Sequence, residues 1–166
     1  MDSQTKEAIW LQCGAAIDSL ESAIRSCPEH VWGDRSKNPE FWYVAYHTIF
    51  WLDFYSSETV EKFAPPEPFG MEEMDPAGLL PPRVYSRQEL LAYLAHSRQK
   101  YKLSVQALNA ANAHLNAGAK RPELTNLEMV FYTMRHLQHH TAQLNLLLRQ
   151  TIDDAPRWVK QAKDRL

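Results

Sequence analysis

The sequence lacks the features that mark membrane, secreted and nucleic-acid-binding proteins. No apolar run approaches the roughly 20 residues that span a bilayer, and the longest, 144–148, is interrupted by Asn145. The net charge at neutral pH is only −2, so we expect no basic surface for nucleic acid or for an anionic membrane. The first residues show no basic stretch followed by an apolar one. We therefore expect no secretory signal and a cytoplasmic location.

Cysteine is scarce as well. The 166 residues include only Cys13 and Cys27, and both fall on one predicted helix. Their separation along a helix would be roughly 21 Å at about 1.5 Å per residue, whereas a disulfide requires Cα atoms within about 7 Å. The two thiols are therefore predicted to be unpaired and structural.

Four segments carry apolar residues at the spacing of an amphipathic helix. No segment shows the sustained alternation of apolar and polar residues that marks a strand, so we predict no strands. Prolines and glycines separate the helical segments, which are expected over about residues 4–26, 39–63, 86–115 and 126–150. A further short helix is expected over residues 156–166.

Three of the predicted helices begin with residues suited to capping. The pair Asn38-Pro39 offers an N-cap followed by a proline for the first helical position. Ser86 followed by Glu89 is a capping-box pattern. Thr125 or its neighbour can cap the last helix. These signals place the starts more firmly than the apolar spacing does.

Residues 64–85 form a long connection between the second and third predicted helices. The segment holds six of the ten prolines and also carries apolar side chains such as Phe69 and Tyr85, which a solvated linker would not need. We therefore expect an ordered crossover. The whole pattern favours a single all-α domain over residues 1–166, folded as an antiparallel four-helix bundle with this proline-rich crossover.

Three of the seven histidines fall on apolar helix faces. At about 100° per residue, His136 and His140 lie about 40° apart, within or beside the apolar stripe of the fourth long helix. His47 lies within the aromatic stripe of the second. His139 falls off the stripe. Three imidazoles are thus expected to project from two helices into one bundle core.

Imidazoles in such a core need partners for their ring nitrogens. Neutral imidazole is a preferred ligand of divalent metals, and two histidines at i and i+4 can chelate one ion. We predict a site formed by His47, His136 and His140 for Zn, Ni or Fe. Three protein ligands leave coordination positions open, as catalytic sites do. The competing interpretation is three core histidines that find ordinary hydrogen-bond partners.

Other metal-site classes fit the sequence less well. In the segment around His136 and His140, Leu137 and Gln138 stand where a zinc protease has its glutamate. The paired Glu-x-x-His motifs of di-iron bundles are absent. No obvious buried carboxylate base is expected near the histidines, and no catalytic residue can be assigned.

The neighbours of the histidines are candidates for a substrate pocket. Tyr43 and Trp51 lie one turn before and one turn after His47, within an aromatic lining that suits an apolar substrate portion. Gln143 follows His140 by three residues. It is either a hydrogen-bond partner of a ligand imidazole or a polar residue at the edge of the core.

The order of these motifs resembles the DinB-like superfamily of metal-binding four-helix bundles. The resemblance is carried by the lone histidine in FWYVAYHTIFWLDFY, by the proline-rich segment ending in LPPRVYSRQELLAYL and by the H-x3-H pair in RHLQHHTAQLNLLLRQ. It covers about residues 9–150. It implies an up-up-down-down-type bundle with His47, His136 and His140 as metal ligands, and it makes a homodimer an expectation.

The resemblance also implies possible activities. Characterised members of the superfamily include thiol-dependent enzymes, such as bacillithiol or mycothiol S-transferases and maleylpyruvate isomerase. We therefore expect a metal-dependent enzyme acting on a small molecule, either a hydrolase or an S-transferase that uses a low-molecular-weight thiol. The alternatives are a non-catalytic metal-binding, small-ligand-binding or stress-response module, and a structural bundle without metal.

Overall fold

The computed structural model describes residues 1–166 and contains helices but no strands. A single isolated β-bridge joins Asn116 and Thr125. The elements are α1 (Ser3–Ser26), α2 (Glu29–Trp32), α3 (Phe41–Tyr55), η1 (Glu72–Met74), α4 (Arg87–Ala107), η2 (Gly118–Lys120) and α5 (Asn126–Ile152), where η marks a 3₁₀ turn. The predicted all-α class is therefore confirmed. None of the helices combines the length and the apolar character that a bilayer crossing requires.

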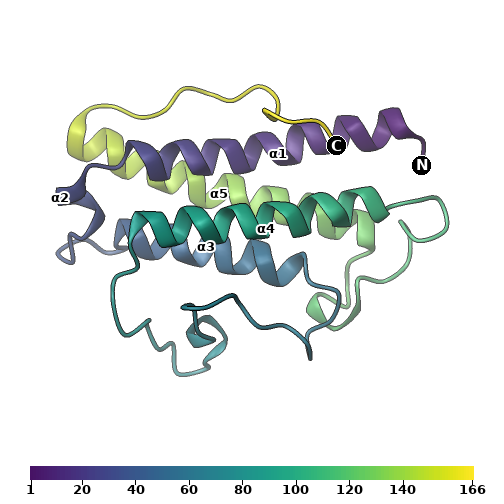
Figure 1. Ribbon diagram of the computed structural model, residues 1–166, viewed down its shortest axis with the longest axis horizontal. Helices are drawn as coiled ribbons and strands as arrows, with labels where there is room; N and C mark the ends of the chain where they lie inside the picture. Colours follow the sequence, from purple (N-terminus) through teal and green to yellow (C-terminus); the bar gives the residue numbers. More distant parts are fainter.

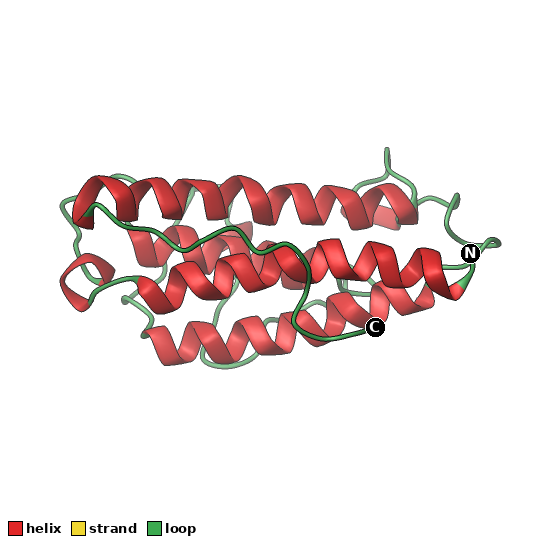
Figure 2. Cartoon of the chain, turned by 90° about the horizontal axis from the view of Figure 1, so that it is seen from above, coloured by secondary structure: helices red, strands yellow, loops and turns green.

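The four long helices lie side by side along the long axis of the molecule (Figures 1 and 2). Helices α1 and α3 each pack against both α4 and α5. The colours of Figure 1 show that α1 and α5 run in one direction and that α3 and α4 run in the other. Because α3 and α5 are neighbours, the residues of these two helices can meet at a shared face.

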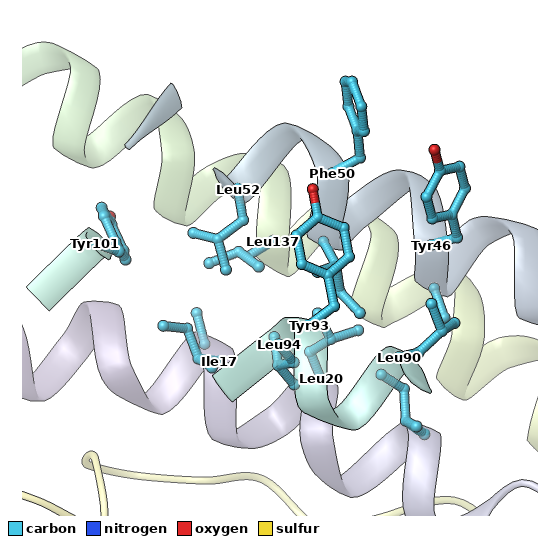
Figure 3. Close-up of a cluster of buried hydrophobic side chains, with 14 of the residues drawn as sticks. Ile17, Leu20, Tyr46, Phe50, Leu52, Leu90, Tyr93, Leu94, Tyr101 and Leu137 are labelled. Atoms are coloured by element: carbon cyan, nitrogen blue, oxygen red, sulfur yellow. The ribbon is translucent and has the colours of Figure 1, made fainter. Parts of the chain in front are cut away.

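The core is built from aliphatic and aromatic side chains of all four long helices. Ile17 of α1, Leu52 of α3, Leu94 of α4 and Leu137 of α5 are buried in one cluster (Figure 3). Removing such surface from water stabilises a fold by about 25 cal/mol per Å². This packing determines which face of α3 and which face of α5 turn toward each other.

Two of the predicted helix starts are confirmed, and one is wrong. Ser86 and Thr125 each cap their helix through a complete capping box, with a glutamate three residues later. Helix α3 begins only at Phe41, with Glu40 as N-cap and without a side-chain cap. The predicted cap, Asn38, belongs with Pro39 to the turn that precedes the helix.

Helix α3 ends at Tyr55, eight residues before the predicted end at position 63. The polar residues after Tyr55 have other partners: the hydroxyl of Ser57 donates to the carbonyl oxygen of Asp53 at 2.8 Å. The ammonium group of Lys120 donates to the carbonyl oxygens of Tyr55 and Ser57. A cation at these terminal carbonyls stabilises the helix end.

Helix α4 ends at Ala107 rather than at the predicted residue 115. The side chain of Asn112 donates to the carbonyl oxygen of Ala107 at 2.9 Å, and that of Asn109 accepts from the backbone N–H of Ala111 at 2.8 Å. Asparagine side chains that bond the local backbone in this way compete with helix formation. The residues from 108 to 125 form the connection to α5 instead.

The predicted C-terminal helix over residues 156–166 is wrong. This segment is extended and runs along α1 (Figure 1). The backbone N–H of Ala162 donates to the carbonyl oxygen of Leu11 at 2.9 Å, and Arg98 joins Asp18 to Asp164. A side chain at Gly14 would meet the Cβ atom of Ala162 at 2.6 Å. The contacts with α1 and α4 thus stabilise the extended conformation of this segment. The sequence of residues 156–166 alone does not reveal these contacts.

Residues 56–86 connect α3 to α4 and contain only the short turn η1. Phe69 and Tyr85 of this segment are buried against the core. The ring of Phe69 stacks on that of Tyr93 at a centroid distance of 4.4 Å. The segment is therefore held over one side of the bundle, where it can contribute side chains to the α3 surface.

A buried charge pair joins α3 to α4. Asp53 is fully buried, forms an ion pair with Lys100 and accepts a hydrogen bond from the hydroxyl of Tyr93 at 3.0 Å. The variant Asp53→Ala leaves the hydroxyl of Tyr93 without its acceptor and Lys100 without its ion-pair partner. We expect it to lower the free energy of unfolding by about 3 kcal/mol, measured by urea unfolding. The exposed Glu61 provides the control, since Glu61→Ala should change stability by less than about 0.5 kcal/mol. Equal stabilities of the two variants would contradict this role of Asp53.

Candidate metal centre

Three histidines converge where α3 faces α5. His47 comes from α3, and His136 and His140 come from successive turns of α5. One ring nitrogen from each lies within 4.8 Å of the corresponding atoms of the other two. The ring centroids are 4.5 Å apart for His136 and His140, and 4.7 Å apart for His47 and His140. The three side chains could hold one metal ion.

The orientation of His47 is fixed by a carboxylate from the proline-rich connection. Nδ1 of His47 lies 2.6 Å from Oε2 of Glu73, and the indole N–H of Trp51 donates to the same oxygen at 3.0 Å. The side chain of Glu73 is only 4% exposed. Because an ionised carboxylate only accepts hydrogen bonds, Nδ1 of His47 carries the proton. In the neutral imidazole the lone pair then lies on Nε2.

Glu73 corrects the expectation that no buried carboxylate lies near the histidines. It belongs to η1, within the proline-rich connection. Because it is not on the same helix as His47, helical spacing in the sequence does not place the two residues together. The two residues are brought together only by the path of residues 56–86 over α3. The sole signal in the sequence is the acidic pair Glu72-Glu73 in an otherwise largely uncharged stretch.

His140 has a comparable partner within its own helix. Its Nδ1 lies 2.7 Å from Oε1 of Gln143. Since an amide oxygen only accepts, Nδ1 of His140 is the donor and Nε2 is left with the lone pair. Gln143 thus lies behind His140 as a hydrogen-bond partner, one of the two roles considered for it from the sequence.

His136 has no such partner. Its Nδ1 is buried and makes no hydrogen bond. A buried ring nitrogen without a partner costs free energy, and coordination to a cation would remove that cost. Outer partners that fix the tautomer are typical of metal-ligating histidines, and His47 and His140 both have them. The donor set therefore fits a divalent metal ion.

His136 and His140 are held in the neutral form that metals bind. Burial, together with the neighbouring imidazoles of His140 and His47, lowers the pKa of His136 to about 3. Burial also lowers the pKa of His140, although its hydrogen bond with Gln143 opposes this shift. At neutral pH both rings are uncharged.

Glu73 remains ionised. Burial alone would raise the pKa of its carboxyl group, but the hydrogen bond from His47 and those from Tyr43 and Trp51 outweigh burial and lower it. The carboxylate gives the cluster a fixed negative charge next to His47. A cation bound among the three imidazoles would be attracted by this charge.

Aromatic side chains surround the cluster. The rings of Tyr43 and Trp51 lie 6.3 and 6.2 Å from that of His47, so two of the three predicted pocket residues flank it. Tyr55 packs edge-on against His136 at 5.8 Å. Arg121, which the sequence did not single out, donates to the hydroxyl of Tyr55 at 3.2 Å. Nothing in its loop sequence marked this contact.

A cavity lies beside the cluster rather than at it. It has a volume of about 860 Å³ and is bounded by the ends of α3 and α4, the start of α5 and the loop between α4 and α5. Tyr55 and Thr133 line it, whereas none of the three histidines does. Tyr55 thus separates this cavity from His136.

Comparison with known proteins gives one match. The family model described as DinB superfamily matches residues 12–144, a span that includes His47, His136, His140 and Glu73. No curated protein and no solved structure matches the chain.

The low pKa of His136 makes the stability of the metal-free protein depend on pH. Below pH 6.5 the unfolded chain protonates this histidine, whereas the folded chain does so only near pH 3. Stability is therefore lost as the pH falls, by about 2–3 kcal/mol from His136 between pH 7 and about pH 4.5. The variant His136→Gln should show a smaller loss in urea unfolding, and the exposed control His114→Gln should match the wild type. Identical losses in all three proteins would refute this account.

Proposed function

The chain belongs to the DinB superfamily, and we propose that it is a metal-dependent S-transferase that uses a low-molecular-weight thiol. In this proposal His47, His136 and His140 bind one divalent ion, Zn, Ni or Fe. The convergence of their three ring nitrogens within 4.8 Å supports the metal site most directly. Three protein ligands leave coordination positions for a small molecule.

The chemistry of a three-imidazole site suits a thiol. A divalent ion held by neutral histidines supplies Lewis acidity, which stabilises the anionic form of a thiol or of water. The thiol reference pKa is about 8.5, far below that of bulk water, so its deprotonation requires less help from the protein. The residues around the ligands then decide which of the two reactions is favoured.

Glu73 favours thiol transfer over hydrolysis. Its carboxylate oxygen Oε2 accepts from both His47 and Trp51, and its side chain is almost fully buried. It is therefore occupied in holding His47 and is not free to take a proton from water as a general base. Since no other carboxylate lies among the ligands, a nucleophile with a low pKa suits this site better.

The chain's own thiols do not serve as the nucleophile. Cys13 and Cys27 are free and buried, as expected from the sequence. Burial raises the pKa of Cys13 to about 11 and that of Cys27 to about 12. Both remain protonated at neutral pH, so a reactive sulfur has to come from a second small molecule.

The aromatic surroundings suit the apolar part of an electrophilic substrate. Tyr43 and Trp51 flank His47, and Tyr55 lies against His136. Apolar walls with a few convergent polar groups are typical of small-molecule sites. We propose that these three side chains orient the substrate, while the three histidines and Glu73 maintain the site.

The proposal extends to the assembly, location and topology expected from the sequence. We propose a homodimer in the cytoplasm, with an antiparallel four-helix bundle in which residues 56–86 serve as the crossover. The opposite directions of the helix pairs α1–α5 and α3–α4 support this topology (Figure 1).

Glu73 should determine metal affinity through His47. The variant Glu73→Gln keeps the size of the side chain but removes the charge, and we expect it to weaken Zn²⁺ binding 10- to 100-fold. Competition with a chromogenic chelator measures this affinity. Glu67 lies in the same connection and is exposed, so Glu67→Gln should bind Zn²⁺ like the wild type. Equal affinities of the two variants would exclude this role of Glu73.

Turnover distinguishes the proposed reaction from its alternatives. Metal-loaded protein should accelerate the reaction of monochlorobimane with glutathione, bacillithiol or mycothiol, and His136→Gln should lose the acceleration. Hydrolysis of p-nitrophenyl esters without added thiol would overturn S-transfer in favour of a hydrolase. Metal binding without either reaction would indicate a non-catalytic binding module.

A further inference from the structure

A second, smaller cavity lies on the other side of α5 from the histidine cluster. It has a volume of about 450 Å³ and lies between α5, Ser19 of α1 and residues 156–158 of the extended C-terminal segment. None of the three clustered histidines lines it. The cavity exists only because the C-terminal segment is extended along α1, so the sequence alone did not suggest it.

Two residues that line this cavity carry a buried side-chain oxygen without a hydrogen-bond partner. These oxygens are Oγ1 of Thr141 and Oδ1 of Asn145, one helical turn apart on α5. The side chain of Thr141 is almost completely inaccessible, since the residue is only 3% exposed. Buried polar atoms in folded proteins normally have partners. These two oxygens therefore mark a place where a bound ligand can supply the missing hydrogen-bond donors.

Thr141 departs from the pattern of the other threonines beyond the first turn of a helix. The hydroxyls of Thr48, Thr133 and Thr151 each donate to the carbonyl oxygen four residues earlier, at 2.6–2.8 Å. This back-bond is the usual way for a helical threonine to satisfy its hydroxyl. Thr141 does not make it, although Leu137 offers the same carbonyl. Its hydroxyl is thus left without an internal partner, in a residue that lines the cavity.

The cavity also carries unneutralised positive charge. Arg149 and Arg157 line it, and no carboxylate does. Most other arginines of the chain form ion pairs, as Arg98 does with Asp18. Arg149 and Arg157 form none. A guanidinium group presents several N–H donors in a planar fork that matches carboxylate and phosphate groups.

A flat apolar surface completes the lining. Trp158 is 75% exposed and Leu146 is 55% exposed, and both border the cavity. An exposed tryptophan beside arginines offers a face on which a planar ring can stack. The three chemical features together are a positive charge, unpartnered oxygens and an aromatic wall.

From these features we infer a ligand site, separate from the proposed metal site, for a small organic anion. The ligand would carry a carboxylate or phosphate for Arg149 and Arg157, and a hydroxyl or amine to donate to Thr141 or Asn145. A planar ring would pack against Trp158. The cavity volume suits a molecule of about the size of a substituted benzoate.

Isothermal titration calorimetry with 3-hydroxybenzoate tests this site on metal-free protein, so the result does not depend on the proposed function. We expect saturable binding that is weaker for benzoate, which lacks the hydroxyl donor, and for 3-hydroxybenzyl alcohol, which lacks the charge. The variant Arg149→Gln should weaken binding of 3-hydroxybenzoate about tenfold or more. Thr141→Val should remove the preference over benzoate and leave the melting temperature unchanged, since its hydroxyl has no internal partner.

Arg135 provides the matched control. It is an exposed arginine of α5 that has no ion pair and does not line the cavity. Arg135→Gln should bind 3-hydroxybenzoate like the wild type. The inference would be overturned if Arg135→Gln and Arg149→Gln weakened binding equally. It would also be overturned if 3-hydroxybenzoate, 3-aminobenzoate and phenyl phosphate all failed to bind the wild type.

Discussion

The hydrogen bond between His47 and Glu73 is the contact on which the arrangement of the candidate site depends. It places a proton on Nδ1 of His47, and in the neutral imidazole the lone pair then lies on Nε2. It also ties the proline-rich connection to α3, because Glu73 belongs to that connection. The same bond occupies the carboxylate and removes it as a general base. This one contact thus orients His47, and in the proposed function it also bears on the kind of reaction.

The packing around this contact also buries imidazoles, and this burial costs free energy. His136 and His140 remain neutral because burial lowers their pKa values, and Nδ1 of His136 has no partner at all. Such an arrangement is unfavourable without a ligand. The packing of α3 against α5 brings the three side chains together. Perturbed pKa values and unpartnered buried atoms commonly coincide with functional sites.

The sequence predicts those features that depend on helical spacing. The apolar stripes and capping boxes give the all-α class and the starts of α4 and α5, and the same angular argument brings His47, His136 and His140 together. Features that depend on distant contacts are not predictable in this way. Glu73 reaches His47 only through the path of an irregular segment. The C-terminal residues have helical spacing but are extended, because α1 offers backbone and side-chain partners such as Leu11.

A crystal structure of the Zn²⁺-loaded protein, with anomalous diffraction measured at the zinc edge, tests the central claim most directly. We predict one zinc ion at roughly 2.0–2.1 Å from a ring nitrogen of each of His47, His136 and His140, with Glu73 still bonded to Nδ1 of His47. A zinc ion bound elsewhere, with no anomalous signal between α3 and α5, would contradict the account.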